Sequence, residues 1–302
     1  MRMISAAETV DALTIAEAAE IIAETYKALA NGDVEPSTPS AMRIAGPPHR
    51  IQLKGAILKS DGIAGARLSS RGHPRLMLWD LQSGAPILFL EENWLYAFRT
   101  GISGAVTARW LMPCPNPRIA LIGAGAIATH MARGFGELCA PALIQVASRT
   151  RESAERLARE VGTPTVRVTV ADSIEQAVRD ADIVATITTA STRIVETGWI
   201  KPGATVLSMG GGPEFDIGVW RNASHRFVDD LDYALYQGDL SSWVKDGMLT
   251  EAEIKADIKG IGEVANGRWH GRNDANESTL AVIQGLTALD LALAYRILQK
   301  QS

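Results

Sequence analysis

Apolar residues in the first third of the chain follow two different spacings. From Ile15 to Leu29 they recur at helical spacing, after a capping-box sequence at Thr14-Ile15-Ala16-Glu17 and before Gly32. A proline-rich stretch follows, and then four short apolar runs separated by glycines predict strands of an antiparallel or mixed sheet. These runs cover residues 50–58, 63–69, 76–80 and 86–90. Residues 93–111 are predicted to form a helix that ends before a proline cluster at 113–117.

Beyond the prolines, strand-like and helix-like patterns alternate. The predicted strands are residues 118–122, 143–147, 166–170, 182–186, 205–209 and 226–229, with helices between the earlier ones. Alternation of this kind is typical of an α/β domain with a doubly wound parallel sheet. A last helical pattern at 280–298 has no strand after it, and we expect it to pack back on the first domain.

Composition narrows the class of protein. The 302 residues are 46% hydrophobic and 21% charged, as in folded globular proteins. A net charge of −4, with no basic block, argues against a nucleic-acid partner. Two cysteines give no disulfide framework, no apolar run is long enough for a membrane helix, and the first residues turn polar too early for a signal peptide. We expect a cytoplasmic protein without a membrane partner.

The segment after the strand at 118–122 has the G-x-G-x-x-A form of a dinucleotide fingerprint. In Gly123-Ala124-Gly125-Ala126-Ile127-Ala128, Gly123 would make the tight turn, Gly125 would let a pyrophosphate approach the backbone, and Ala128 would let the helix pack on the strand. The alternative is an ordinary glycine turn. We predict a Rossmann-type domain at residues 116–277, beside an α+β substrate and dimerisation domain made of residues 1–115 and 278–302. The residues expected at the cofactor are Gly123, Gly125, Ala126, Ile127, Ala128, Thr188, Met209 and Gly210.

The end of the second strand indicates which cofactor is bound. An NAD site usually has an acid there, whereas this chain has Ser148-Arg149-Thr150-Arg151. Hydroxyl and guanidinium groups suit a 2′-phosphate, so NADP(H) is predicted as the preferred cofactor, with NAD(H) still possible. Alternatively, Arg149 and Arg151 are solvated residues at the start of a helix.

Several segments along the chain match one known pattern. They are Leu78-Trp79-Asp80, Phe98-Arg99-Thr100-Gly101, the fingerprint itself, Gly238-Asp239-Leu240, and the terminal Thr279-Leu280 with Gly285 and Asp290. Together they resemble the ornithine cyclodeaminase/μ-crystallin family over nearly the whole chain. The resemblance implies a Rossmann domain joined to a substrate domain that also dimerises, and a small amino or imino acid held near a nicotinamide. Activities within this family include cyclodeaminases, alanine dehydrogenase, imine reductases and a thyroid-hormone-binding crystallin.

The resemblance also assigns the substrate carboxylate to arginines. Arg99 matches the arginine of the family's R-T-[AG] motif, and Arg43 lies about where the other carboxylate-binding arginine falls. A planar guanidinium binds a carboxylate bidentately, which agrees with this role. The alternatives are an Arg99 paired with Glu91 or Glu92, and an Arg43 on a surface loop.

Two positions depart from the family pattern. Arg67 stands where the family has an acid/base lysine, and arginine does not release its proton. If the strands are neighbours, Lys54 could fill the same space; otherwise it is a surface lysine of an edge strand. Gly212 stands where cyclodeaminases carry an aspartate, which shifts the prediction from cyclodeamination towards imine reduction; Glu214 and Asp216 are the alternative acids for that role.

The predicted function is therefore reduction by NAD(P)H of a small imino acid, a ketimine or a 2-oxo acid plus amine, to an L-amino acid, or the reverse oxidation. Arg99, Arg43 and Arg67 would hold the carboxylate, and Lys54 would keep the imine nitrogen protonated; Lys54 and Arg67 are the catalytic candidates. The alternatives are an ornithine- or lysine-type cyclodeaminase and a non-catalytic NADPH-dependent ligand-binding protein. The five histidines are scattered, so no metal site is predicted, and a homodimer is expected from the resemblance.

Overall fold

The chain divides into two compact units. The computed structural model describes residues 1–37, 40–44, 49–69 and 73–301, with the backbone alone at 40–44, 49 and 50. Unit 1 comprises Met1–Thr100 with Gly285–Ser302, and unit 2 comprises Gly101–Gln284. The first division lies within helix α3 (Asn93–Leu111), upstream of the proline cluster where the sequence predicts it.

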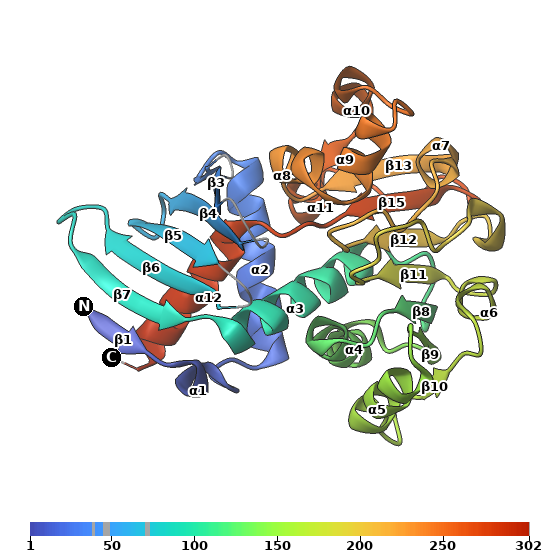
Figure 1. The fold of residues 1–302 in the computed structure, drawn as a ribbon, viewed down its shortest axis with the longest axis horizontal. Helices are drawn as coiled ribbons and strands as arrows, with labels where there is room; N and C mark the ends of the chain where they lie inside the picture. Colours follow the sequence, from blue (N-terminus) through green and yellow to red (C-terminus); the bar gives the residue numbers. More distant parts are fainter. Residues whose placement is uncertain (38–39, 45–48, 70–72, 302) are drawn as a thin grey trace. The chain divides into compact units, whose positions relative to one another are not determined.

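The described part of unit 1 forms a seven-stranded sheet in the order β1-β7-β6-β5-β4-β2, with β3 also paired to β4 (Figure 1). Strand β1 is parallel to β7 and the other pairs are antiparallel, so the sheet is mixed, which is one of the two arrangements that the apolar runs leave open. The strands are β1 (Arg2–Ile4), β2 (Val34–Pro36), β3 (Ser40–Ile44), β4 (His49–Leu58), β5 (Ile63–Ser69), β6 (Arg75–Asp80) and β7 (Pro86–Glu91). The helices are α1 (Ala6–Thr9), α2 (Ile15–Ala30) and α12 (Thr287–Lys300), with the start of α3.

Helix α12 covers one face of this sheet, where it contacts β4, β5 and β6 and packs beside α2. The predicted capping box is present at the start of α2, where Glu17 N–H donates to the Thr14 hydroxyl at 3.2 Å. Gly65 allows the close approach of α12, because a Cβ there would lie 2.7 Å from a methyl of Leu291. The last helix therefore packs on the first unit, as predicted.

The opposite face of the sheet is apolar but only partly buried. One rung of aligned residues crosses four strands and contains Ala66, Met77, Phe89 and Met3. Ala66, Met77 and Phe89 are partly buried and Met3 is 68% exposed. This sheet face leaves unit 1 with an apolar surface that its two long helices do not cover.

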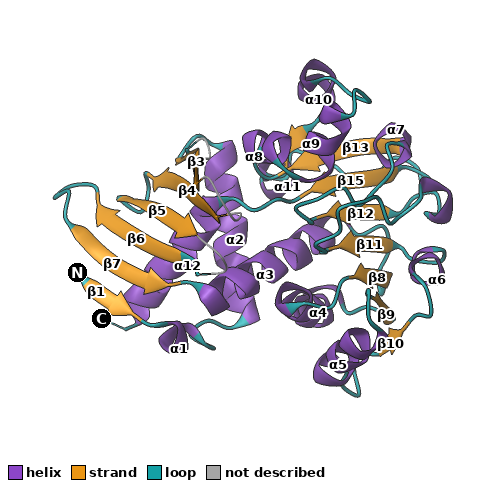
Figure 2. Cartoon of the chain, in the orientation of Figure 1, coloured by secondary structure: helices purple, strands orange, loops and turns teal. Residues whose placement is uncertain are grey.

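The described part of unit 2 is an eight-stranded sheet in the order β10-β9-β8-β11-β12-β15-β13-β14, in which each strand is parallel to its neighbours (Figure 2). The strands are β8 (Arg118–Ile122), β9 (Leu143–Ala147), β10 (Val168–Val170), β11 (Ile183–Thr186), β12 (Thr205–Ser208), β13 (Ala223–Val228), β14 (Lys259–Gly260) and β15 (Ser278–Val282). The helices are α4 (Ala126–Cys139), α5 (Arg151–Val161), α6 (Ile174–Val178), the 3₁₀ helix η1 (Thr197–Trp199), α7 (Gly218–Asn222), α8 (Leu231–Tyr236), α9 (Gly238–Lys245), α10 (Glu251–Asp257) and α11 (Gly262–Ala265).

The order of the strands defines a switch point in this sheet. From β8 the chain runs outward through β9 and β10, and then returns to add β11 and β12 on the other side of β8. Ligands of such doubly wound sheets bind beyond the carboxyl ends of the strands at this reversal. The predicted α/β fold is thus confirmed, and it directs attention to the ends of β8, β9, β11 and β12.

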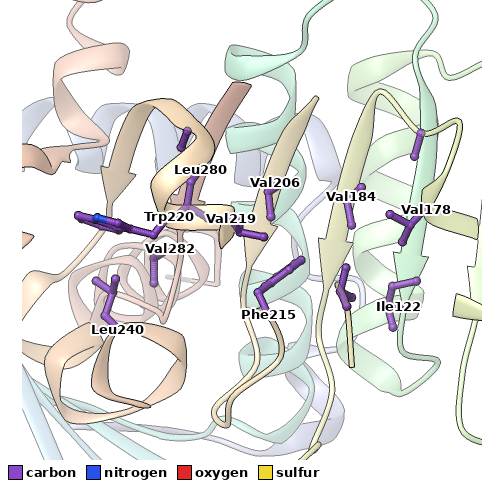
Figure 3. Close-up of a cluster of buried hydrophobic side chains, with 14 of the residues drawn as sticks. Ile122, Val178, Val184, Val206, Phe215, Val219, Trp220, Leu240, Leu280 and Val282 are labelled. Carbon is purple, nitrogen blue, oxygen red and sulfur yellow. The ribbon is translucent and has the colours of Figure 1, made fainter. Parts of the chain in front are cut away.

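The terminal helical pattern predicted at 280–298 is wrong in its first part. Residues 278–282 form β15, which pairs with β12 and β13, and α12 begins only at Thr287. Leu280 and Val282 belong instead to the core of unit 2, beside Val206 of β12 (Figure 3). A short continuous apolar run fits a buried strand as well as a buried helix, which explains the error. It also moves the second domain boundary from 277–278 to 284–285.

The aromatic residues of unit 2 serve packing. Trp243 is fully buried and meets Trp220 edge to face at 6.4 Å between ring centroids. Both belong to the hydrophobic core of unit 2, where Figure 3 shows Trp220. No helix in the part of the chain that the structure describes is both long and apolar enough to cross a membrane.

Candidate functional site

The glycine-rich turn follows β8 at the switch point. Gly123 has φ +121°, and a Cβ there would lie 2.4 Å from the carbonyl oxygen of Ile187, so only glycine fits. Gly125 is the exposed N-cap residue of α4, and a Cβ there would meet nothing within 4 Å. Ala128 is buried. The turn therefore leaves open space in front of the free N–H groups of α4, where an anion can approach.

Ser148, Arg149 and Thr150 follow β9, where the sequence predicts, and Arg151 is the first residue of α5. The Ser148 hydroxyl donates to the Thr150 carbonyl at 2.6 Å, and the Thr150 hydroxyl donates to Ser153 at 2.8 Å. Arg151 is held by Glu155 at 3.0 Å and Asp172 at 2.8 Å. Arg149 is exposed, and among the described residues no ion pair engages it. Of the two arginines, Arg149 is thus the one whose guanidinium is available to a ligand.

A buried carboxylate organises the ends of β11 and β12. Glu214 accepts hydrogen bonds from the Thr186 hydroxyl at 2.6 Å, from the Thr188 hydroxyl and N–H at 2.6 and 2.8 Å, and from Gly210 N–H at 2.8 Å. Burial and the negative charge of Asp239 raise the pKa of Glu214, whereas its hydrogen-bond donors lower it. The pKa of Glu214 is raised to about 7 as the net effect. The predicted cofactor residues Thr188 and Gly210 are therefore linked to each other through Glu214.

Neither acid that could have replaced the missing aspartate is available for that chemistry. All four donors around Glu214 belong to the protein, and its side chain is fully buried. Asp216 accepts from Thr197 N–H at 2.5 Å and Gly218 N–H at 2.7 Å. Both side chains fix backbone segments. Gly212 itself has no room for an aspartate, because a Cβ there would lie 2.1 Å from the Ala190 carbonyl oxygen.

In unit 1, Lys54 and Arg67 are direct cross-strand partners on β4 and β5. Lys54 is 6% exposed and Arg67 is 8% exposed, and both lie on the sheet face that α12 covers. For Lys54 to fill the same space as Arg67, β4 and β5 must be neighbours. The two strands are neighbours, so this requirement is met. The alternative of a surface lysine on an edge strand is wrong, since β4 pairs with β5 on one side and with β2 and β3 on the other.

Arg99 is buried in the part of α3 that belongs to unit 1. Its Nε and Nη2 donate to the two carboxylate oxygens of Asp290 at 2.6 and 2.8 Å. The remaining nitrogen, Nη1, is buried and has no hydrogen-bond partner. The alternative pairing with Glu91 or Glu92 is therefore wrong: Asp290, far along the sequence on α12, is the partner.

Gly285 brings Lys54 and Arg99 together. The Lys54 ammonium donates to the Gly285 carbonyl at 3.3 Å. A Cβ on Gly285 would lie 3.0 Å from the unpartnered Arg99 Nη1, and Gly285 has φ +100°, so glycine is required there. Two cationic side chains therefore converge on one glycine of unit 1.

Glu92 completes a group of five buried charged residues, here named the charge cluster: Lys54, Arg67, Glu92, Arg99 and Asp290. Glu92 accepts from Arg67 Nε at 2.5 Å, and burial followed by the charge of Asp290 raises its pKa to about 8. The two guanidinium groups lie 4.2 and 5.4 Å from the ring centroid of Tyr96. Three cations against two carboxylates make the charge cluster suited to an anion.

Sequence reasoning found the three cations of the charge cluster but not its carboxylates or Tyr96. Asp290 is part of the family pattern, and the sequence suggests Glu92 only as an alternative partner of Arg99; it does not indicate that Glu92 pairs with Arg67 or Asp290 with Arg99. The side chain of Arg43, on β3, lies outside the described part of the chain. Within the described residues, no group of three or more histidine, cysteine, aspartate or glutamate side chains could hold a metal ion.

The sequence model of the ornithine cyclodeaminase/mu-crystallin family matches residues 67–302. The chain belongs to this family. The match includes both the glycine-rich turn of unit 2 and most residues of the charge cluster. Of that cluster, Lys54 alone lies before the matched residues.

Relatives in this family carry reductase names. The chain is 29% identical over 196 residues to the ketimine reductase mu-crystallin of Rattus norvegicus, covering 64% of this chain and 58% of the rat protein. It is 26% identical over 234 residues to a Δ¹-pyrroline-2-carboxylate reductase of Bacillus cereus, covering 74% of this chain and 70% of that protein. The chain thus spans less than two thirds of the rat relative's length.

The fold is shared by a solved family structure. The Δ¹-pyrroline-2-carboxylate reductase of Thermococcus litoralis, in complex with NADH and L-proline, matches with a TM-score of 0.89 and 22% identity. The match covers 99% of this chain and 97% of that one. The two-unit architecture, with a Rossmann-type unit 2, is therefore that of the family.

Proposed function

We propose that this chain is an NAD(P)H-dependent reductase that interconverts a small imino acid, supplied as a ketimine or as a 2-oxo acid plus an amine, and an L-amino acid. The observation that carries the proposal is the charge cluster, in which Arg99, one of three cations, has a buried Nη1 without a partner. Such a nitrogen is costly unless a ligand supplies its acceptor. The glycine-rich turn of unit 2 and the reductase names of the relatives support the same proposal.

The residues of unit 2 fit a dinucleotide. Gly123 makes the tight turn against the Ile187 carbonyl, Gly125 leaves the open space that a pyrophosphate needs, and the exposed N-terminus of α4 offers N–H donors to it. Ala126, Ile127 and Ala128 form the first turn of that helix, while Thr188, Met209 and Gly210 follow β11 and β12 at the same edge of the sheet. A bound nicotinamide would supply the hydride.

The charge cluster would hold the substrate. Arg99 Nη1 would donate to the substrate carboxylate, while its Nε and Nη2 keep their bonds to Asp290. Arg67 would add positive charge but no proton, because a guanidinium does not deprotonate at physiological pH. Lys54 would keep the imine nitrogen protonated, which makes the imine carbon a better hydride acceptor. Reduction then transfers one hydride to carbon and leaves the proton on nitrogen.

A panel of imines tests this function. Cyclic imines, and 2-oxo acids mixed with amines, are incubated with NADPH, and its consumption is followed together with the amino acid formed. Lys54→Met should abolish reduction, whereas Lys59→Met should leave it unchanged, because Lys59 is an exposed lysine paired with Glu35 at 2.6 Å. If both variants turn over like the parent, Lys54 has no catalytic role.

The same panel separates the other two functions. With Glu214 and Asp216 bound to backbone segments, we find no acid among the described residues of β12 and its following loop for the distal amine of ornithine. L-Ornithine should therefore yield no proline and ammonia at a rate near that of imine reduction. Tight binding of a carboxylate without any NADPH oxidation would instead favour a non-catalytic ligand-binding protein.

We further propose that NADP(H) is preferred over NAD(H). Arg149 is exposed and free of ion pairs within the described residues, as a 2′-phosphate ligand should be. Arg149→Gln should weaken NADPH binding by about 1.5–3 kcal/mol and leave NADH binding unchanged. Arg151→Gln is the matched control, because Arg151 already pairs with Glu155 and Asp172. Equal affinities of the parent protein for NADPH and NADH would contradict the preference.

The uncovered sheet face supports a homodimer. Its rung of Ala66, Met77, Phe89 and Met3 is apolar, and neighbouring Leu53 and Leu68 are 43% and 44% exposed. A contiguous apolar face of this kind is typical of a protein–protein interface. A second copy of the chain would bury this face. Light scattering during gel filtration measures the molecular mass and thereby distinguishes a dimer from a monomer.

A further inference from the structure

Glu92 occupies a fixed position between β7 and α3. Its side chain is fully buried, its N–H donates to the Pro74 carbonyl at 3.2 Å, and its carbonyl accepts from Tyr96 N–H at 2.7 Å. The side chain therefore has no contact with solvent, and its two carboxylate oxygens depend on the charge cluster for partners.

Only one of the two carboxylate oxygens of Glu92 has a hydrogen-bond partner. Oε2 accepts from Arg67 Nε at 2.5 Å, whereas Oε1 is buried without any hydrogen-bond partner. An ionised carboxylate with an unpartnered buried oxygen loses solvation that nothing replaces. A proton on Oε1 removes that charge and turns the oxygen into a donor. The geometry thus favours the protonated acid.

The surrounding charges act in the same direction. Burial and the negative charge of Asp290 on α12 oppose ionisation of Glu92. Arg67 on β5 and Arg99 on α3 favour ionisation, but their combined effect is smaller. The remaining member of the charge cluster is Lys54 on β4, and beside the cluster lies Tyr96 on α3, over whose ring both guanidinium groups lie. As a result the pKa of Glu92 lies at about 8, above the pH at which an ordinary glutamate ionises.

We propose that Glu92 is a positioning residue that keeps its proton while a carboxylate occupies the charge cluster, so that ligand binding and protonation of Glu92 are coupled. The proposal rests on the proposed function, which places a carboxylate at Arg99. With Glu92 neutral, Asp290 alone opposes the three cations, and the charge cluster attracts an anion more strongly. An ionised Glu92 would repel that anion and would compete with it for Arg67.

Calorimetric titration with pyruvate as the probe measures this coupling. The protein is saturated with NADP⁺, and pyruvate keeps one negative charge across the range from about pH 6 to about pH 9.5. We expect the dissociation constant to be constant at the acid end and to rise about tenfold per pH unit above about pH 8. Titrations in buffers of different ionisation enthalpy should show proton uptake on binding near that pH.

Two variants identify the titrating group. Glu92→Gln keeps an oxygen for Arg67 and cannot ionise, so pyruvate binding should become independent of pH, without proton uptake. Glu91→Gln is the matched control, since Glu91 is a partly exposed neighbour paired with Arg75 at 3.0 Å, and it should keep the parent profile. Lys54→Arg, which stays charged throughout, should also keep that profile.

The outcomes separate this proposal from the proposed function. Pyruvate binding that does not vary with pH, or a profile that Lys54→Arg flattens and Glu92→Gln does not, overturns the coupling and leaves the carboxylate site standing. Absence of pyruvate binding at every pH overturns both. If Glu92→Gln does not fold, proton uptake on pyruvate binding is compared between the parent protein and Lys54→Arg. Uptake that persists in Lys54→Arg comes from an acid other than Lys54, whereas loss of uptake in that variant overturns the proposal.

Discussion

The ion pair between Arg99 and Asp290 gives a sharp prediction on stability. Replacing Arg99 by alanine leaves the Asp290 carboxylate, 1% exposed, without the two donors that now lie 2.6 and 2.8 Å from its oxygens. Breaking a buried pair by removing one partner costs about 3–5 kcal/mol, because the remaining charge is neither solvated nor paired. We therefore expect Arg99→Ala to lower the free energy of unfolding by about that amount.

Urea unfolding followed by circular dichroism measures the effect. The matched control is Arg133→Ala, since Arg133 forms an exposed pair with Glu160 at 2.9 Å, and it should cost no more than about 1 kcal/mol. The double variant Arg99→Met with Asp290→Leu replaces both charges by apolar side chains, so it should lose much less than Arg99→Ala alone. A loss for Arg99→Ala as small as that for Arg133→Ala would refute the reasoning.

This stability cost also determines how the role of Arg99 in substrate binding is best tested. Arg99→Lys keeps a charge beside Asp290 and should fold, but a single ammonium cannot bind Asp290 through two nitrogens and a ligand through a third. It should raise the KM for the imine while leaving NADPH affinity unchanged. An unchanged KM would make Arg99 a structural residue only.

Three further predictions concern other parts of the chain. Gly125→Ala should leave stability unchanged, because its Cβ meets nothing within 4 Å, but should weaken NADPH binding measured by titration; Gly198→Ala, equally unhindered, should leave both unchanged. Met77→Asp, in the middle of the uncovered sheet face, should convert a dimer to a monomer in light scattering, and an unchanged mass would place the interface elsewhere. Because the pKa of Glu214 is raised to about 7, its contribution to stability is complete below about pH 4.5 and is lost as the pH rises through about 7. Glu214→Gln should therefore flatten the pH dependence of urea unfolding in that window, and an unchanged slope would contradict the shifted pKa.

Much of unit 2 follows from the sequence because its signals are local. A strand followed by Gly123 and Gly125 specifies a turn that only glycine can make, and the alternating apolar runs specify a parallel sheet. Strands β4 to β7 of unit 1 follow for the same reason, since glycines separate each apolar run from the next, whereas β1, β2 and β3 are not predicted. Residues 278–282 are the exception, because a short apolar run has no periodicity that distinguishes strand from helix.

The charge cluster is different, because the tertiary structure decides which of its residues meet. Lys54 and Arg67 face each other only through the register of β4 and β5, and a shift of one residue would place them on the opposite face of the sheet. Asp290 reaches Arg99 only because α12 returns to unit 1 from the other end of the chain. The sequence thus determined which side chains can bind an anion. Packing alone decided that a carboxylate holds Arg99, that Glu92 is cut off from water, and hence which of these charges remains for a ligand.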